Sequence, residues 1–124
     1  MEIQGRVVVV TGAGRGIGAA MCRQFASARA ERVVVSDRDL ESAQCVAAEL
    51  GAVGLAVACD VAVESEVQQL VASTLESCGR IDIFCSNAGI TVKGGVETTN
   101  SDWQRMLDVN VMSRIYAARA VIPS

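Results

Sequence analysis

Histidine is absent from the 124-residue sequence, and lysine occurs once, at Lys93. Without an imidazole, the chain cannot form a Ser-His or Cys-His nucleophile pair, a histidine general base or a zinc site with a histidine ligand. Proline also occurs once, and aromatic residues make up 3% of the chain. Apolar residues make up 51%. That fraction is enough to bury a core, so we expect a single globular domain over residues 1–124 rather than disorder.

The net charge is weakly acidic. Eleven Lys and Arg stand against 14 Asp and Glu, and the arginines are scattered rather than gathered into a basic stripe. Nucleic acid is therefore not an expected partner. No apolar run approaches the ~18 residues of a membrane span, and residues 1–6 do not resemble the start of a signal peptide. We expect no membrane association, no metal site and a cytoplasmic location.

Five cysteines are an odd number, and none of them has C-x-x-C spacing. They are Cys22, Cys45, Cys59, Cys78 and Cys85, and most of them fall within apolar stretches. This pattern favours small buried side chains in a reducing compartment, and a reactive thiol is the less favoured alternative.

Short β-branched runs alternate with longer segments of helical period. The runs are nearly continuous in apolar residues and cover residues 7–10, 33–36, 53–58 and 81–86. Strands buried on both faces have this character, so the pattern predicts an α/β fold with a parallel sheet that helices cover on both faces. Between the strands, apolar residues recur every three or four positions and should share one face of each helix. The three expected faces comprise Ile17, Met21, Phe25 and Ala28; Leu40, Ala43, Ala47 and Leu50 before Gly51; and Val67, Leu70 or Val71, and Leu75 before Gly79.

A last helix is expected to begin at Ser101 and to run towards Pro123. Ser101 and Gln104 have the spacing of a capping box, in which each side chain bonds the other residue's N–H group. Met106 and Leu107 precede Asn110 by four and three residues, which places a polar amide on the apolar face of the helix. A buried amide must be paired or costs roughly 1 to 3 kcal/mol.

A glycine-rich turn follows the first expected strand and opens the first helix. Its sequence is Thr11-Gly12-Ala13-Gly14-Arg15-Gly16-Ile17-Gly18. Glycines at these positions permit a tight turn, close approach of the backbone to a pyrophosphate, and close packing of the helix on the sheet. The helix N-terminus then attracts the anion. The context predicts a dinucleotide site in a Rossmann-type sheet, and a flexible loop without a ligand is the alternative.

Asp37 lies 19 residues after Gly18, at the end of the second expected strand. That offset is typical of a carboxylate that binds the adenosine ribose hydroxyls, whereas a helix N-cap or a loop acid is the alternative. A carboxylate there repels a 2′-phosphate and so favours NAD over NADP, although Arg15 and Arg38 could offset the repulsion. A P-loop needs a lysine after its last glycine, but the single lysine of this chain is Lys93. Nucleoside triphosphate hydrolysis is therefore disfavoured.

Four motifs in this order resemble those of the short-chain dehydrogenase/reductase family. They are the glycine motif Thr11-Gly12-x-x-x-Gly16-x-Gly18, the pair Asp60-Val61 after the third strand, Asn87-Ala88-Gly89 after the fourth, and Asn110 in the last helix. The resemblance covers essentially the whole chain. It implies a sheet of about four strands in the order 3-2-1-4, incomplete relative to the family.

The resemblance also implies roles for single residues. Asp60 would accept a hydrogen bond from the adenine amino group while the backbone of Val61 fixes the ring edge; the alternative for Asp60 is a solvated loop acid. Asn87 would help to bind the cofactor, with Ala88 and Gly89 leaving room for a ribose, and it could equally tie neighbouring strands. Asn110 would be an active-site residue that holds a water, and a paired core amide is its alternative.

The family's catalytic Tyr, with a Lys four residues later, is not present in this sequence. The one tyrosine is Tyr116, and position 120 is Ala120. Family members are about twice as long and keep their catalytic Ser, Tyr and Lys in the second half, so we expect this chain to be the cofactor-binding half and inactive by itself.

The resemblance implies an NAD-dependent oxidoreductase that transfers a hydride to or from a small carbonyl or secondary alcohol. The full-length form would be a homo-oligomer. The alternative is an inactive dinucleotide-binding or interaction module that pairs through an open sheet edge.

Overall fold

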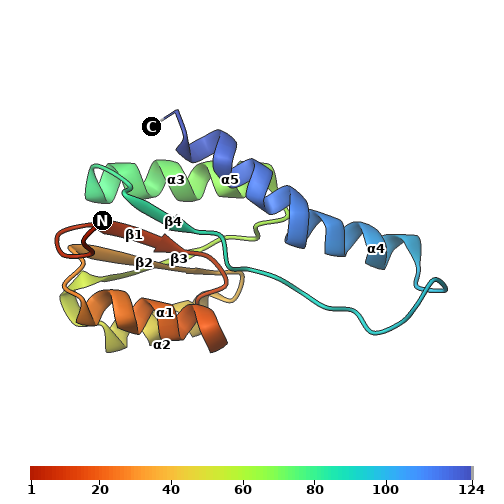
Figure 1. Ribbon diagram of the computed structural model, residues 1–124, viewed down its shortest axis with the longest axis horizontal. Helices are drawn as coiled ribbons and strands as arrows, with labels where there is room; N and C mark the ends of the chain where they lie inside the picture. The colour runs from red at the N-terminus through yellow and green to blue at the C-terminus, as the bar shows by residue number, and fades with distance from the viewer. Residues whose placement is uncertain (124) are drawn as a thin grey trace.

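The computed structural model describes residues 1–123, which form one parallel sheet with helices on both faces (Figure 1). The strands and helices alternate along the chain. In order they are β1 (Val7–Val10), α1 (Gly16–Ser27), β2 (Arg32–Asp37), α2 (Leu40–Glu49), the 3₁₀ turn η1 (Gly51–Val53), β3 (Gly54–Ala58), α3 (Glu64–Cys78), β4 (Ile83–Cys85), α4 (Asn100–Leu107), the π-helical turn η2 (Asp108–Met112) and α5 (Ser113–Val121).

The strand order is β3-β2-β1-β4, and all three pairings are parallel. This confirms the expected Rossmann-type α/β fold. β1 has the expected bounds, and the other strands differ from expectation by one or two residues at their ends. β4 is the shortest because its pairing with β1 begins only at Val8 and Ile83, after Asp82 has bonded the Val7 N–H group through its side chain.

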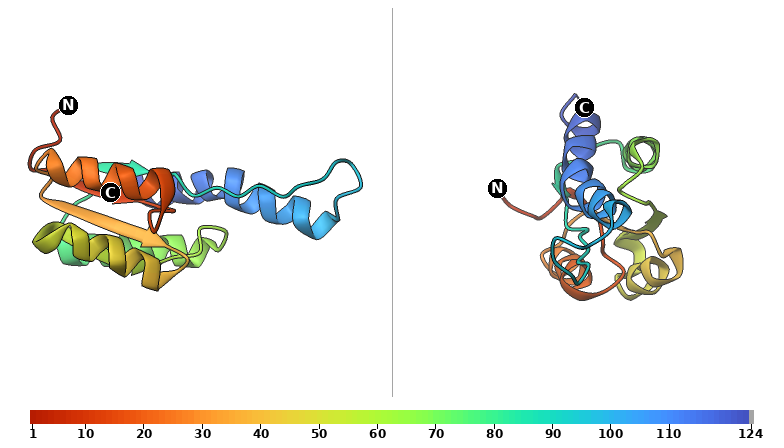
Figure 2. Two further views of the ribbon diagram at one scale, coloured as in Figure 1. Left: turned by 90° about the horizontal axis from the view of Figure 1, so that it is seen from below. Right: turned by 90° about the vertical axis from the view of Figure 1, so that its right-hand side faces the viewer.

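The core has two layers, one on each face of the sheet. Alternate valines of β1 and β2 point to opposite faces, as the two-residue period of a strand requires. Val8 and Val35 pack towards α1 and α2, and Val9 and Val34 pack in the other layer with residues of α3 and α5. The helices cover the two faces as Figures 1 and 2 show. No helix within residues 1–123 has the length and apolar character needed to cross a membrane.

The expected buried face of α1 is wrong in part, because Phe25 packs against the core but other members of that face do not. Ile17 is 75% exposed, and Ala28 is also exposed. The residues that α1 buries are Gly18, Ala19 and Cys22. Small side chains let this helix lie close to the sheet, so the larger apolar residues are displaced towards its flanks.

The expected start of the last helix is also wrong. α4 begins at Asn100, and its N-cap is Thr99, whose Oγ1 accepts a hydrogen bond from the Asp102 N–H group at 3.3 Å. Gln104 bonds Asp108 instead of the backbone of Ser101. The Thr99 hydroxyl reaches the first turn before Ser101 can, because Ser101 already has helical geometry.

The segment from α4 to α5 is one nearly continuous helix with a π-helical turn in its middle. Its buried residues are Val109, Ser113 and Ala117. Leu107, expected on the apolar face, is 48% exposed. α4 buries none of its residues, and with the preceding loop it extends past the carboxyl end of the sheet (Figures 1 and 2).

The cysteines follow the expectation only in part. All five are unpaired; Cys22 and Cys59 are buried, whereas Cys45 is exposed on α2. Burial raises the pKa of Cys22 and of Cys59 to about 12. These two thiols therefore stay protonated at neutral pH and act as small apolar side chains.

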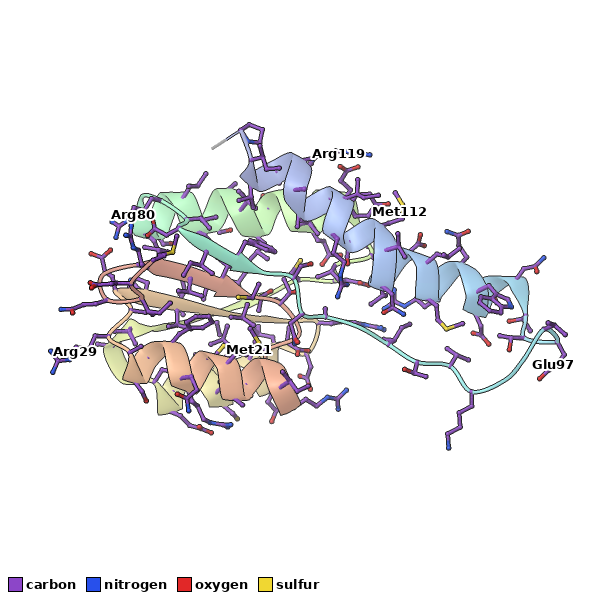
Figure 3. All side chains as sticks on the ribbon, viewed as in Figure 1. Met21, Arg29, Arg80, Glu97, Met112 and Arg119 are labelled. Atoms are coloured by element: carbon purple, nitrogen blue, oxygen red, sulfur yellow. The ribbon has the colours of Figure 1, made fainter. Side chains whose placement is uncertain are left out.

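Asp82 ties the amino-terminal edge of the sheet together. Its Oδ2 accepts hydrogen bonds from the Val7 N–H group at 2.8 Å and from Arg80 Nε at 2.9 Å. Arg80 also bonds the Gly5 carbonyl and pairs with Glu31. Figure 3 shows Arg80 at the opposite end of the molecule from Glu97, which marks the tip of the loop before α4.

We predict that Asp82→Asn lowers the free energy of unfolding by about 1 kcal/mol at pH 7, because the charge-assisted bonds from Val7 and Arg80 weaken. The Val7 N–H group, followed by Arg80, holds the pKa of Asp82 below its ordinary value of 3.8. The stabilisation is therefore present above pH 3.8 and is lost as the pH falls through the folded-state pKa. Urea unfolding as a function of pH measures this effect.

Glu76→Gln is the matched control, because Glu76 is exposed on α3 and makes no hydrogen bond or ion pair within residues 1–123. It should leave the midpoint unchanged. Equal stability of Asp82→Asn and the parent chain between pH 3 and pH 7 would contradict the assignment.

Candidate cofactor site

A cleft of about 250 Å³ opens where the strands end. The residues after β1, at the end of β2, and after β3 and β4 all contribute to its wall. The structure brings together eight of the residues singled out in the sequence: Gly12, Arg15, Asp37, Asp60, Val61, Asn87, Ala88 and Gly89. Ligands bind in such a crevice in open α/β sheets, at the point where the strand order reverses, and here β1 lies between β2 and β4.

The helix α1 begins beside this cleft, which its N-cap residue Arg15 lines, and it begins without a side-chain cap. Arg15 is its N-cap residue and has an extended backbone, and within residues 1–123 no side chain bonds the first N–H groups of the helix. Uncapped N–H groups and the positive end of the helix dipole together form a binding site for an anion.

At two positions, Gly12 in the loop and Gly18 in the first turn of α1, neighbouring atoms leave no room for a side chain. Gly12 has φ +62°, and a Cβ there would lie 2.8 Å from Ala88 Cα. A Cβ on Gly18 would run into the Gly12 carbonyl oxygen and the Asn87 side chain. The glycines therefore let the loop, α1 and the segment after β4 meet around the mouth of the cleft.

Asp37 fixes the loop from the neighbouring strand. Its Oδ2 accepts a hydrogen bond from the Gly14 N–H group at 2.9 Å, and its Oδ1 accepts one from the Asp39 N–H group at 2.9 Å. Asp39, and not Asp37, is the N-cap of α2, with its side chain accepting from Glu41 and Ser42. The N-cap alternative for Asp37 is thus wrong, and its carboxylate stands at the cleft with both oxygens already oriented.

Thr11 and Asn87 join the ends of β1 and β4. The Thr11 hydroxyl is buried and accepts hydrogen bonds from the N–H groups of Asn87 and Ala88 at 3.1 and 3.2 Å. In return, Asn87 Nδ2 donates to the carbonyls of Thr11 and Gly12, both at 3.2 Å. The strand-tying role of Asn87 is present, and it leaves the Asn87 side-chain carbonyl free of these bonds.

Asp60 lies at the end of the cleft next to α4. Its Oδ1 accepts a hydrogen bond from the Ala62 N–H group at 3.0 Å, and its Oδ2 pairs with Arg105 at 3.4 Å. Its own N–H group donates to Glu66 at 3.0 Å. The Asp60 side chain is only 22% exposed and is held by partners on two sides. The alternative that Asp60 is simply a solvated loop acid is therefore incomplete.

Asn110 is fully paired inside the π-helical turn. Its Oδ1 accepts from the Ile90 N–H group at 2.9 Å, and its Nδ2 donates to the Ile90 carbonyl at 2.8 Å. The Arg114 guanidinium donates to the Ala88 carbonyl at 2.8 Å from the next turn. These bonds fix the backbone that follows Asn87. Asn110 is therefore a paired amide, and its expected active-site role stays a prediction.

Five sequence-predicted residues do not line the cleft. Thr11 and Gly18 support its walls, Gly16 and Ile17 belong to the exposed first turn of α1, and Asn110 acts through Ile90. Sequence reasoning missed other lining residues, above all Arg105. Arg105 is 45 positions from its partner Asp60, and no local pattern links the two residues.

Cys59 also lines the cleft but is not a nucleophile. Burial, then Glu66 and Asp60, raises the pKa of its thiol to about 12. No thiolate is therefore available at neutral pH, and the cleft offers binding groups rather than a reactive sulfur.

The chain matches the family model described as short chain dehydrogenase over residues 6–124. It is 37% identical to meso-2,3-butanediol dehydrogenase of Serratia marcescens, over 99% of this chain and 49% of that protein. A short-chain dehydrogenase/reductase of Burkholderia phymatum in complex with NAD superposes with a TM-score of 0.95 at 32% identity, over 99% of this chain and 45% of that one.

A metagenomic short-chain oxidoreductase in complex with NADP superposes with a TM-score of 0.90 at 34% identity, over 99% of this chain and 57% of that one. The chain thus spans about half the length of the proteins that it matches. The strand order, the uncapped glycine turn and the family match agree, and the chain belongs to the short-chain dehydrogenase family.

Proposed function

We propose that the cleft binds a nicotinamide dinucleotide, with its diphosphate at the N-terminus of α1 and its adenosine half between Asp37 and Asp60. The observation that carries this proposal is the uncapped start of α1, whose N-cap residue Arg15 lines the cleft together with Gly12. A Cβ at Gly12 would run into the backbone of Ala88, so glycine is needed there for the loop before α1 to lie against the segment after β4.

NAD is the proposed cofactor rather than NADP. Asp37 lines the cleft at the end of β2, where its carboxylate can accept hydrogen bonds from both adenosine ribose hydroxyls. A 2′-phosphate in the same place would meet a like charge. Arg15 and Arg38 also line the cleft, but neither forms an ion pair with Asp37 within residues 1–123.

At the two ends of the dinucleotide, the residues have distinct proposed roles. Asp60 accepts a hydrogen bond from the adenine amino group, and the backbone of Val61 lies against the ring edge. Asn87, Ala88 and Gly89 face the ribose of the nicotinamide half, where the chain has little side-chain bulk. The free side-chain carbonyl of Asn87 supports this placement.

For the complete protein, we propose an oxidoreductase that acts on a small carbonyl compound or secondary alcohol. The bound nicotinamide would supply the hydride chemistry. Within these 124 residues no Tyr-x-x-x-Lys can be written, and Tyr116 lies in α5 with the Arg119 guanidinium 5.9 Å from its ring centre. Asn110 would orient the active-site backbone through Ile90. The missing acid–base groups favour, as second candidate, a dinucleotide-binding module without turnover.

Self-association is proposed through an apolar stripe on the outer face of α4, η2 and α5. The stripe comprises side chains four residues apart that are each at least 40% exposed: Trp103, Leu107, Val111 and Ile115. In an α-helix, four-residue spacing drifts around the axis, and the wider π-helical turn offsets this drift. An exposed apolar stripe of this length is typical of a helix-to-helix interface.

The proposed location is the cytoplasm. Its support is the chemistry of the five cysteines, which are all unpaired in the described part of the chain. Unpaired cysteines are typical of proteins in reducing compartments.

We predict that Asp37→Ala in the complete protein weakens NADH binding at least about tenfold, because two charge-assisted hydrogen bonds to the ribose are lost. NADPH binding should weaken less or improve, so the selectivity for NADH falls. Fluorescence titration with both cofactors measures the change. Glu41→Gln, an exposed acid in the first turn of α2, is the control and should leave both affinities unchanged. Unaltered affinity and selectivity in Asp37→Ala would overturn the ribose assignment.

A second prediction concerns turnover by the 124-residue chain. The purified chain should bind NADH, but with NAD⁺ as the hydride acceptor it should not oxidise meso-2,3-butanediol or any other secondary alcohol, because it has no phenol with a lysine partner to move the proton. Absorbance at 340 nm follows the reaction. Measurable turnover would contradict the proposal that the acid–base groups come from elsewhere in the complete protein. A complete protein that binds NADH without any turnover would favour the module instead.

A third prediction tests the apolar stripe. Leu107→Gln in the complete protein should weaken self-association by about tenfold, since burying an amide in place of an isobutyl group at an interface is unfavourable. Sedimentation equilibrium gives the dissociation constant. Val96→Gln is the control, because Val96 is 98% exposed in the loop before α4 and outside the stripe. A monomeric parent protein, or equal effects of the two substitutions, would refute the interface.

A further inference from the structure

Within residues 1–123, an ion pair at the adenosine end of the cleft is the one side-chain bond between α4 and an element outside its own continuous helix. Within residues 1–123, Arg105 is the one side chain of α4 that bonds outside its own helix and cap, through its NH1 atom and Asp60 Oδ2 at 3.4 Å. Both side chains are partly buried, with 33% of Arg105 and 22% of Asp60 exposed. The pair is therefore less screened by solvent than the Arg119–Glu64 pair between α5 and α3.

Arg105 completes a set of contacts that hold both carboxylate oxygens and the backbone N–H group of Asp60. The Ala62 N–H group holds Oδ1, Arg105 holds Oδ2, and the Asp60 N–H group is itself bonded to Glu66. A carboxylate held at both oxygens presents its remaining lone pairs in fixed directions. Because Arg105 and Asp60 both line the cleft, the remaining acceptor direction of Asp60 is available to a ligand.

We propose that Arg105 is a positioning residue for the adenine end of the cleft, where it orients the Asp60 carboxylate to accept a hydrogen bond from an exocyclic amino group. This inference rests on the proposed binding of a nicotinamide dinucleotide. The chemistry makes the site selective for adenine over hypoxanthine, which presents a carbonyl oxygen in place of the amino group. An oriented carboxylate accepts a hydrogen bond from the amino group of adenine and repels the carbonyl oxygen of hypoxanthine.

The pair also connects the adenine end to a helix that buries none of its residues. Without Arg105, no side-chain bond of the described residues joins α4 to Asp60. Asp60 is then restrained only by Ala62 and Glu66. The loss of orientation should appear in base selectivity rather than in the stability of the sheet, because Arg105 lies outside both core layers.

The test measures the affinities of the complete protein for NAD⁺ and for nicotinamide hypoxanthine dinucleotide by calorimetry. In the parent protein NAD⁺ should bind more tightly. Arg105→Gln should weaken NAD⁺ binding about fivefold and hypoxanthine dinucleotide binding much less, so that the ratio of affinities falls towards one. Arg105→Lys should restore most of the ratio, because an ammonium group can still pair with Asp60.

Asp60→Asn shows whether Arg105 acts through Asp60. In that background Arg105→Gln should cause no further change of the ratio, whereas in the parent it should lower it. Arg119→Gln is the matched control, because Arg119 pairs with Glu64 between α5 and α3, away from the cleft, and is labelled in Figure 3. It should leave both affinities unchanged. Thermal unfolding without ligand should be the same for the parent and Arg105→Gln.

Four results would overturn the inference. They are equal binding of the two dinucleotides by the parent protein, equal weakening of both by Arg105→Gln, no effect of Arg105→Gln, and an effect that persists in Asp60→Asn. A parent protein that binds neither dinucleotide would instead overturn the proposed function itself.

Discussion

The rest of the site depends on one constraint: α1 begins without a side-chain cap beside the ends of β1 and β4. A helix N-terminus leaves N–H groups without partners inside the helix, and a side chain, water or a ligand can satisfy them. α2 does so through Asp39, and α4 does so through Thr99. α1 has no such cap, and its approach to the cleft is maintained by contacts that only glycine permits at positions 12 and 18.

The surrounding bonds serve mainly to keep the start of α1 in place. Thr11 and Asn87 exchange hydrogen bonds between the ends of β1 and β4, and Asp37 bonds the Gly14 N–H group from β2. Asn110 fixes the next segment by bonding both backbone groups of Ile90. Asp37 and Asn87 use part of their bonding capacity on the scaffold and also line the cleft, whereas Thr11 and Asn110 support the cleft from outside its wall. A single polar side chain can therefore be structural and ligand-binding at once.

Much of this architecture could be predicted from local patterns, because parallel strands buried on both faces are continuous in apolar residues and β1 and β2 are short and valine-rich. Features that depend on close packing could not. The buried face of α1 is predicted only in part, because the residues that the helix buries are Gly18, Ala19 and Cys22, with Phe25 packed at the edge of the core. The cap of α4 was wrong because two hydroxyls, Thr99 and Ser101, were both within reach of the first turn. Arg105 was missed because its partner, Asp60, is on another element.

The central claim is that main-chain N–H groups at the start of α1 bind a diphosphate. Backbone amide NMR of the complete protein during titration with ADP-ribose observes those groups directly. The account predicts that the largest shifts fall on the amides of residues 12–18, with smaller shifts at residues 37 and 60. Saturable binding that leaves the amides of residues 12–18 unshifted would contradict it.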